Sequence, residues 1–324
     1  MPNIMLTDYC NQDCPYCFAQ EMMSRKGRDI SFMKFKKAVD YLKRSGVGRI
    51  GIIGGEPTLH PRFLQLLDYV VEKGMSVRLY TNGLTSKDVC TGLAEYDAKV
   101  LEVLLNLNDR RSYSKGQLAQ VNFFMEHLNE KLNLGYTIWE LDFSLGFHRD
   151  MILKYDLPKA VRIGLASPIV RRQSRDFFHP SDFPRIGRAI IKQVELLEQD
   201  DILVGFDCGF VMCMFSTRAL GILTRKSVGF SSQCRPIIDI DLELNATPCF
   251  PLGGVLRKPI DDFPDLDALK DHFSGRLESL KVFGNNGKCM SCKYFKRRQC
   301  RGWCLARIIN CQEGLMDKFA GLGV

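Results

Sequence analysis

The sequence lacks both a long apolar run and a secretory signal. No uninterrupted apolar stretch approaches the ~18 residues of a membrane span, and the opening MPNIMLTDYC is too short and polar for the hydrophobic part of a signal peptide. Internal repeats and low-complexity tracts are also missing. We therefore expect a cytoplasmic protein, whose 324 residues suffice for roughly two domains.

A disulfide scaffold is a poor fit to the cysteines. The chain has 13 of them, but it is large, lacks a signal and groups its cysteines in short C-x2-C and C-x3-C pairs. Such grouping favours reduced thiolates that hold metal. Cys90 lies three residues before Leu93 on an expected helix and is read as a small core residue.

A concentrated patch of positive charge is missing as well. The formal net charge is +8, yet the basic residues are scattered, and the densest group, residues 293–301, is interrupted by a cysteine. A solvated face explains that group better than a nucleic-acid site. We expect neither a membrane nor a nucleic-acid partner.

The first 200 residues alternate β-rich runs with amphipathic helices. Strands are expected at residues 3–7, 49–53, 76–80, 99–105, 136–143 and 161–165. Three helical stripes are formed by Phe32, Phe35, Val39 and Leu42, by Val121, Met125, Leu128 and Leu132, and by Phe183, Ile186, Ile190, Val194 and Leu197. Six βα units predict an α/β fold with parallel strands, either an open doubly wound sheet or a partial barrel.

The sequence also contains residues typical of helix ends, and its composition changes in the second half. Ser181 suits a helix cap, Pro61 a helix start and Gly74 a helix end. After about residue 200, Gly, Pro and Cys become frequent and helices shorten. We expect a boundary between residues 200 and 230 and a second unit held by cysteines.

Three cysteines stand together near the start, in YCNQDCPYCF. Cys10, Cys14 and Cys17 follow the first expected strand, at the strand ends where α/β folds collect ligands. Three thiolates can hold three irons of a 4Fe-4S cluster and leave the fourth open to a small molecule. A structural zinc site is the alternative, and it needs a fourth ligand such as His60.

The pattern C-x3-C-x-aromatic-C, formed by Cys10, Cys14, Tyr16 and Cys17, resembles the signature of the radical S-adenosylmethionine (SAM) superfamily. The resemblance implies a partial (βα)6 TIM-like barrel in residues 1–205. It also implies that the open iron binds SAM and that one electron, delivered by a donor such as flavodoxin or ferredoxin, cleaves it to a 5'-deoxyadenosyl radical. Cys10, Cys14 and Cys17 would be the catalytic cluster ligands.

Further SAM contacts follow from the same resemblance. Residues 52–57, IIGGEP, resemble the family's GGE motif, so Gly54, Gly55 and Glu56 would hold the ammonium group of SAM. The remaining candidates are Tyr16, Thr81, Asn82, Asn106, Asn108 and Ile163. Asn106 and Asn108 are assigned to the ribose and Ile163 to adenine. A surface carboxylate at Glu56 and turn asparagines are the plainer alternatives.

The later cysteines resemble the SPASM extension, which carries two auxiliary 4Fe-4S clusters, and we assign it to residues 206–324. The implied ligands are Cys213, Cys234, Cys249, Cys289, Cys292, Cys300, Cys304 and Cys311. Carried over in sequence order, one cluster takes Cys234, Cys249 and Cys304 with Cys213 or Cys208, and Cys213 is preferred. The other takes Cys289, Cys292, Cys300 and Cys311. A zinc knuckle remains the alternative for residues 289–304.

Three departures from that pattern are visible. The usual glycine five residues before the second cysteine is Leu244, and an x7 gap separates Cys292 from Cys300. Phe250 stands where sulfatase-maturing relatives carry an aspartate base. Replacement bases are Asp207, Asp239 and Asp241, although each is read first as an ordinary carboxylate.

The resemblance predicts hydrogen abstraction from a peptide or protein side chain, followed by oxidation or cross-linking, as in ribosomal peptide maturation. The triplet starts at Cys10, so we expect a separate peptide-recognition protein or direct substrate binding in the barrel. The alternative is a small-molecule dehydrogenase or epimerase acting on a sugar or aminocyclitol, with Cys208 or Cys213 as hydrogen donor. A non-catalytic metal-binding module is the third possibility.

Overall fold

The computed structural model describes residues 1–17, 19, 23–24, 26–168, 177–230, 232, 234, 236–284 and 287–311. Its fold is mixed α/β, built around one ten-stranded sheet in the order β10-β9-β8-β1-β2-β3-β4-β5-β6-β7. The strands β1 to β7 are mutually parallel where they pair. Their bounds are Asn3–Met5, Arg49–Ile53, Ser76–Thr81, Leu101–Asn106, Leu132–Ile138, Ala160–Leu165 and Leu203–Phe206.

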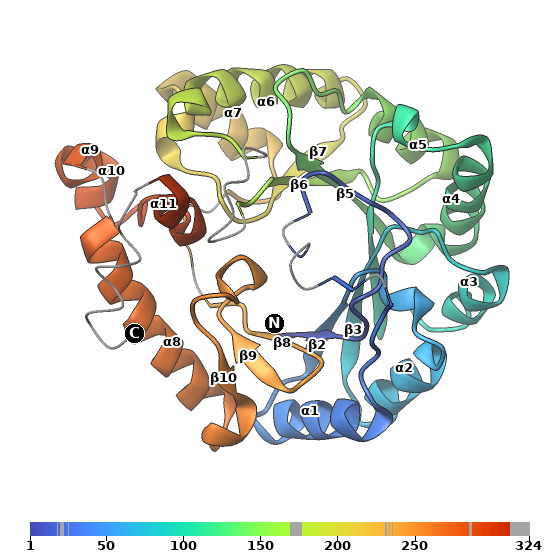
Figure 1. The fold of residues 1–324 in the computed structure, drawn as a ribbon. Helices are drawn as coiled ribbons and strands as arrows, with labels where there is room; N and C mark the ends of the chain where they lie inside the picture. The colour runs from blue at the N-terminus through green and yellow to red at the C-terminus, as the bar shows by residue number, and fades with distance from the viewer. Residues whose placement is uncertain are drawn as a thin grey trace.

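Six helices alternate with these strands and lie on the outside of the curved sheet (Figure 1). They are α1 Phe32–Arg44, α2 Phe63–Glu72, α3 Lys87–Ala94, α4 Lys115–Leu128, α5 Gly146–Tyr155 and α6 Phe183–Glu198. In α1, Ser31 caps the first turn by accepting from the Lys34 amide, and Phe35, Val39 and Leu42 are fully buried. The predicted α/β fold with six βα units is confirmed.

The fifth strand is where the expected boundaries were wrong. β5 runs over Leu132–Ile138 instead of 136–143, and Leu132 opens this strand instead of closing the stripe on α4. A 3-10 turn, η4 Asn129–Lys131, ends the helix one turn early. Leu132 falls four residues after Leu128, so it continues the spacing of the helical stripe although it belongs to the strand. A seventh parallel strand, β7, was not expected.

Two helix starts also differ from expectation. Ser181 lies inside the 3-10 turn η5 Pro180–Asp182, and α6 begins at Phe183 without a side-chain cap. Pro61 precedes α2, which begins only at Phe63. Gly74 follows the end of α2 with φ +65°, as predicted for a helix end. Cys90 is buried in α3, as expected for a core residue.

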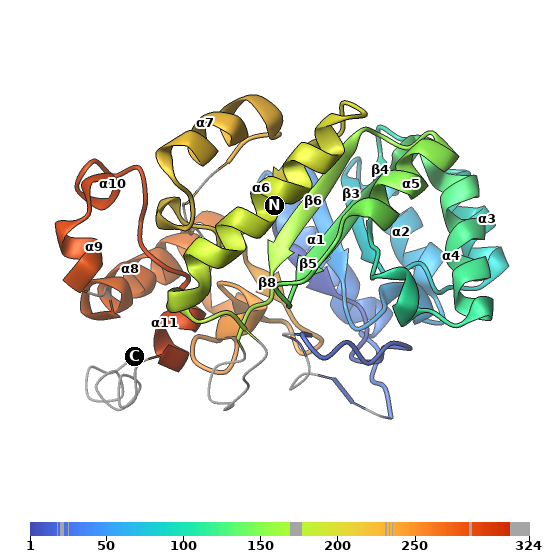
Figure 2. The ribbon, with the colours of Figure 1, turned by 90° about the horizontal axis from the view of Figure 1, so that it is seen from above.

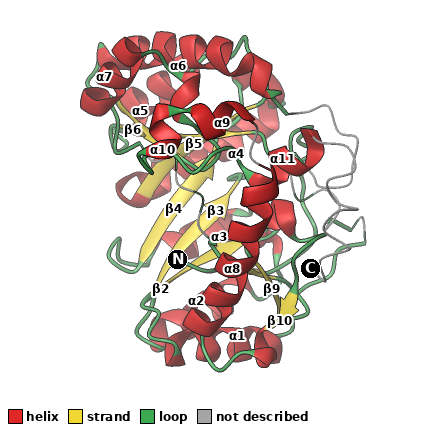
Figure 3. Cartoon of the chain, turned by 90° about the vertical axis from the view of Figure 1, so that its left-hand side faces the viewer, coloured by secondary structure: helices red, strands yellow, loops and turns green. Residues whose placement is uncertain are grey.

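The C-terminal segments continue the same sheet. β8 Asp239–Ile240 pairs parallel to β1, and the antiparallel strands β9 Asn245–Thr247 and β10 Lys258–Pro259 follow. The helices of this half are α7 Thr217–Lys226, α8 Leu266–Gly284, α9 Gly287–Ser291, α10 Lys293–Lys296 and α11 Leu305–Cys311 (Figure 3). The predicted boundary at 205/206 falls within β7 and remains a prediction. No helix among the described residues is long and apolar enough to cross a bilayer.

Candidate active site

The loop that follows β1 carries the three N-terminal cysteines and is closed at its base. The Ile30 amide donates to the Leu6 carbonyl at 2.8 Å, and the Asp8 amide donates to the Arg28 carbonyl at 3.0 Å. The fully buried Asp8 carboxylate accepts from the Arg28 amide at 2.6 Å and from its guanidinium Nε at 2.8 Å. Residues 6–30 therefore leave and re-enter the fold at one point, beyond the carboxyl end of β1 (Figure 2).

Residues 54–56 bind the start of this loop through the main chain. The Gly55 amide donates to the Thr7 carbonyl and the Glu56 amide to the Tyr9 carbonyl, both at 2.8 Å. A Cβ on Gly55 would lie 2.1 Å from the Tyr9 oxygen. The glycines, which we expected to admit a ligand, also admit the backbone of the cysteine loop.

Glu56 is buried at the meeting point of β2 and β3. Its carboxylate accepts from the Thr58 amide at 3.1 Å and hydroxyl at 2.6 Å, the Thr81 hydroxyl at 2.7 Å and the Asn82 amide at 2.7 Å. Burial raises the pKa of Glu56, although the bonds from Asn82, Thr58 and Thr81 lower it in part. Glu56 is thus a fixed acceptor whose ionised form a bound cation would stabilise.

The three cysteines are half-buried and influence one another electrostatically. Burial raises the pKa of Cys10 to about 11; the Gln12 amide lowers it, and the charges of Glu56, Cys14 and Cys17 add to the increase. The side-chain amides of Asn82 and Asn108 lie 3.8 Å from Cys10 Sγ and 3.7 Å from Cys14 Sγ. Predicted ligands and predicted SAM contacts therefore come together at one place.

Residues 4–115 match the sequence profile of the radical SAM superfamily. This part of the chain is therefore similar to the radical SAM superfamily. It is 37% identical over 82 residues to an S-adenosylmethionine-dependent nucleotide dehydratase of Selenomonas ruminantium, a match that covers 25% of this chain and 29% of the relative. It is 34% identical over 122 residues to the subtilosin biosynthesis protein AlbA of Bacillus subtilis, covering 36% and 27%. The matches thus span less than a third of either relative.

The fold is similar over nearly the whole chain to SuiB of Streptococcus suis, solved with its precursor peptide SuiA. The TM-score is 0.69 at 19% identity, and the alignment covers 96% of this chain and 72% of SuiB. At this identity the likeness concerns the fold alone. It agrees with the partial TIM-like α/β arrangement expected of a radical SAM domain.

Two aromatic residues that we did not single out, Tyr113 and Trp139, adjoin the cysteine loop or its partner Asn108. Tyr16 donates to the Asn108 side chain and stacks on Trp139, with ring centroids 5.9 Å apart. The Asn108 amide donates to the Tyr113 hydroxyl at 2.9 Å. Trp139 follows β5 directly, so the strand-end rule would have found it had β5 been placed correctly.

Two predicted SAM contacts lie apart from this group. Asn106 is exposed at the end of β4. Ile163 is buried within β6, and its carbonyl already accepts from the Asp207 amide at 2.8 Å. Their contacts with ribose and adenine remain predictions.

His60, the candidate fourth zinc ligand, uses both ring nitrogens for other contacts. Its Nε2 lies 3.1 Å from the Ile30 carbonyl, and its Nδ1 accepts from the Arg62 amide at 3.1 Å. Both ring nitrogens are engaged, and the residue ties η2 Pro57–Leu59 to the end of the cysteine loop. Among the described residues, no three His, Cys, Asp or Glu side chains are placed to share one metal ion. The donor set of Cys10, Cys14 and Cys17, half-buried and backed by amides, fits an iron-sulfur cluster.

The structure shows the surroundings of the positions that depart from the SPASM pattern. Leu244, at the usual glycine position, has φ +64° and is buried. The Phe250 amide donates to Asp239 at 2.8 Å, so this carboxyl lies beside the position of the missing aspartate. Asp207 pairs with Arg162 at 2.8 Å, and Asp241 pairs with Arg257. Asp207 and Asp241 thus have the ion pairs of ordinary carboxylates.

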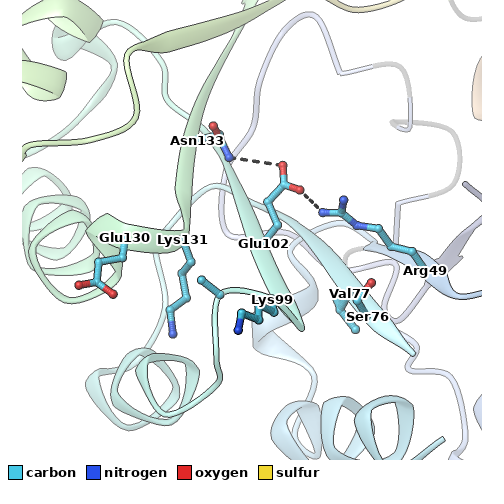
Figure 4. Close-up of a pocket in the computed structure, with 9 residues that line it drawn as sticks. Arg49, Ser76, Val77, Lys99, Glu102, Glu130, Lys131 and Asn133 are labelled. Atoms are coloured by element: carbon cyan, nitrogen blue, oxygen red, sulfur yellow. Dashed lines mark hydrogen bonds and ion pairs between the residues drawn. The ribbon is translucent and has the colours of Figure 1, made fainter. Parts of the chain in front are cut away.

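A cavity of about 190 Å³ lies at the opposite, amino-terminal ends of β2 to β5 (Figure 4). Its central carboxylate, Glu102, bonds Arg49, Arg78 at 2.9 Å and Asn133 at 3.3 Å. The Lys131 ammonium donates to carbonyls at the end of α3, including that of Ala94 at 2.9 Å. Arg49, Arg78 and Asn133 thus converge on Glu102 at the strand ends away from the cysteine loop, although the Nε of Arg49 and that of Arg78 have no hydrogen-bond partner.

Proposed function

We propose that this chain is a radical SAM enzyme that abstracts hydrogen from a peptide or protein substrate and leads to its oxidative modification or cross-linking. One observation carries the proposal: the cysteine loop is bonded, through Thr7 and Tyr9, to the same segment that supplies Glu56. A three-thiolate site and a buried anion are thereby fixed side by side. SAM needs both, because its methionine part chelates a metal and carries a positive charge.

Different residues of the chain would hold the cluster and SAM. Cys10, Cys14 and Cys17 would hold three irons of a 4Fe-4S cluster, and Glu56 with the main chain of Gly54 and Gly55 would hold the ammonium of SAM. When bound, cluster and SAM together supply an electron and a carbon radical able to break an unactivated C–H bond.

The surrounding side chains then position and shield the reactants. Thr81 and Asn82 fix the Glu56 carboxylate, so little reorganisation is needed when the ligand enters. The amides of Asn82 and Asn108 donate toward cysteine sulfurs, an interaction that favours the more negative, reduced cluster. Tyr16, which belongs to the loop, stacks on Trp139, and these two rings would help exclude water.

A peptide substrate is supported by the relatives. AlbA is named for the biosynthesis of a bacteriocin, and SuiB was solved with a precursor peptide. The small-molecule alternative has no comparable support, because the match to the nucleotide dehydratase spans only 82 residues. A reducing donor such as flavodoxin or ferredoxin, and a separate recognition protein, belong to the proposal.

The test uses oxygen-free protein reconstituted with iron and sulfide. Wild type should cleave SAM to 5'-deoxyadenosine in the presence of dithionite, and Cys14→Ala should lose this cleavage by at least ~100-fold while keeping the iron held elsewhere. Cys90→Ala, a core cysteine in α3, is the matched control and should cleave SAM normally. Undiminished cleavage by Cys14→Ala would contradict the proposal.

The substrate class needs a second measurement. A candidate precursor peptide, incubated with SAM and reductant, should lose two mass units on oxidation or ring closure. An unchanged mass with deuterium uptake from solvent would indicate epimerisation instead. No change in any peptide, with turnover of a sugar, would favour the small-molecule alternative.

A further inference from the structure

The cavity at the amino-terminal ends of β2 to β5 carries more positive than negative charge (Figure 4). Arg78 donates to Glu102 from beside the cavity at 2.9 Å and adds a further cation. A cleft in which one sign of charge predominates attracts counter-ions. The cavity therefore favours an anion. Its charged lining residues are the cations Arg49, Lys99 and Lys131 and the carboxylates Glu102 and Glu130.

At the inner wall, two guanidinium groups share a single carboxylate. Arg49 and Arg78 both donate to Glu102, and the Asn133 amide donates to it at 3.3 Å. The Nε of Arg49 and that of Arg78 are buried and have no hydrogen-bond partner among the described residues. Burial lowers the pKa of Arg49, and the charge of Arg78 lowers it further. Glu102 thus compensates only part of the positive charge on this side.

Lys131 adds positive charge from the side of β5. Its ammonium donates to three carbonyls at and just after the end of α3, among them that of Ala94 at 2.9 Å. An ammonium has three hydrogens, so all of them are engaged and none is left for a ligand. Burial lowers the pKa of Lys131, although nearby carboxylates, first that of Glu130, raise it in part. Lys131 therefore contributes charge to the cavity but no free donor.

The rim of the cavity consists of exposed residues, namely Ala98, Lys99 and Glu130. The Lys99 amide donates to the Asp97 carboxylate at 2.7 Å. Its ammonium has neither a hydrogen bond nor an ion pair within the part of the chain that the structure describes. Because this ammonium ends a flexible side chain, it is free to turn toward a ligand, whereas Glu130 opposes an anion from the other part of the rim.

A phosphate group matches the cavity in charge and in size. It carries close to two negative charges at mildly alkaline pH and several strongly accepting oxygens, and arginine and lysine are the side chains that bind it most readily. The cavity volume of about 190 Å³ is several times the ~30 Å³ that one water occupies, so the group fits together with bridging waters. A carboxylate has a single charge and would leave more of the excess uncompensated.

We propose that this cavity binds a phosphate group, either as the free ion or as part of a larger molecule whose remainder stays outside the rim. Lys99 contacts it from the rim and Arg49 from the inner wall, while Lys131 adds attraction. The bound group joins the ends of four neighbouring strands and stabilises the sheet. Substrates of barrel folds collect at the opposite, carboxyl ends of the strands, so this site is separate from the proposed radical chemistry.

Calorimetric titration of the full, anaerobically reconstituted chain with inorganic phosphate at pH 8 measures the binding directly. At constant ionic strength, set with chloride, we expect one site with a dissociation constant below ~1 mM. Phosphate at about 100 times this constant should also raise the thermal midpoint by at least ~3 °C over chloride. Absence of binding heat together with equal midpoints in phosphate and chloride overturns the proposal.

Two rim variants should change the affinity in opposite directions. Lys99→Gln removes the free cation and should weaken phosphate binding about 3- to 10-fold, whereas Glu130→Gln removes the opposing charge and should tighten it about 2- to 3-fold. Both side chains are exposed, so both variants should fold normally.

Lys159→Gln is the matched control for these variants. Lys159 is an exposed lysine just before β6, at the same end of the sheet but outside the lining of the cavity, so its variant should bind phosphate within about 2-fold of wild type. Equal affinities of Lys99→Gln and Lys159→Gln, or weaker binding by Glu130→Gln, would show attraction by net charge alone and overturn the site.

A phosphate monoester distinguishes the two sources of the ligand. Glycerol 3-phosphate carries the same group on a small neutral remainder. If it binds at least as tightly as inorganic phosphate, the site takes the phosphate group of a larger molecule; if only inorganic phosphate binds, the site takes the free ion. Either result supports the site, whereas failure of both ligands refutes it. SAM cleavage by the same preparation is measured separately, so neither result decides the proposed function.

Discussion

At the scale of single residues, the active-site glycines are required by a backbone contact. Gly54 and Gly55 face the main chain of residues 7–10, and the amide of Gly55 and that of Glu56 bond it. The motif therefore fixes the cysteine loop, and its contact with a ligand remains a prediction. Sequence inspection found the glycines but could not show which atoms approach them.

Gly55→Ala should destabilise the fold by about 1–3 kcal/mol, because the added methyl would lie 2.1 Å from the Tyr9 oxygen and the loop must move. Chemical denaturation of the iron-free protein measures the change, and iron retention after reconstitution should fall as well. Gly116→Ala is the control: its Cβ meets nothing within 4 Å, and it should leave stability unchanged or raise it by up to ~1 kcal/mol. A Gly55→Ala protein as stable as wild type would disprove the contact.

Leu244 illustrates a competition between strain and burial. A left-handed conformation costs a leucine about 1–2 kcal/mol, whereas burying its side chain contributes about 1.5–3 kcal/mol. Burial stabilises the fold by more than the strain destabilises it, so leucine is tolerated where relatives use glycine.

Both Leu244→Gly and Leu244→Ala should lower the free energy of unfolding. The value should be about 0.5–1 kcal/mol lower for the alanine variant than for the glycine variant, because alanine loses the burial and keeps the strained backbone. Urea unfolding of the three proteins ranks them. An alanine variant more stable than the glycine variant would show that φ at 244 is not positive in solution.

At the scale of elements, a side chain of α5 holds the segment that follows β4. His148 of α5 is fully buried, and its Nε2 donates to the Leu107 carbonyl at 2.9 Å, just beyond β4. Burial lowers the pKa of His148 to about 4. This ring positions residues 106–108, which include two predicted ribose contacts.

The depressed pKa of His148 makes stability depend on pH. The unfolded chain takes up a proton near pH 6.5 and the folded one only near pH 4, so the free energy of unfolding falls as pH drops through this window, by about 3 kcal/mol from this group. His148→Gln should flatten that part of the profile, measured by urea unfolding at several pH values. His127→Gln, at an exposed ring on α4, should keep the wild-type slope. Equal slopes in wild type and His148→Gln would exclude the effect.

At the scale of the whole molecule, the two halves of the chain share one sheet. β8 pairs with β1, and Asn3 donates to the buried Asp239 at 2.6 Å. Arg307 of α11, which donates to the Ala166 carbonyl, and the packing of η6 Met212–Met214 on α6 add contacts between the halves. A boundary near residue 205 therefore divides the sequence more clearly than it divides the sheet.

The two tryptophans allow a test of this coupling. Trp139 lies beside the cysteine loop and Trp303 among the later cysteines, so Trp303→Phe and Trp139→Phe each leave one reporter. Urea titrations of the two variants, followed by fluorescence, should give coincident transitions if the sheet unfolds as one unit. Transitions well separated in urea would instead show two independent domains.

The sequence by itself determined the class of the fold and which of the predicted site residues lie close together. Alternating βα periodicity specifies parallel strands, and residues just after such strands meet at one edge, so Cys10, Glu56 and Asn82 were predictable as neighbours. Short spacings such as C-x3-C keep the cysteines near one another, however the remaining elements are arranged.

The tertiary structure alone decided which distant residues meet. Leu132 fits a helix and a strand equally well, and only the pairing of β5 with β4 and β6 chose the strand. Likewise only the pairing of β8 with β1 brings Asp239 to Asn3, 236 positions away in the sequence. Spacing along the chain constrains nearby residues, whereas packing between remote elements depends on the burial of all of them together.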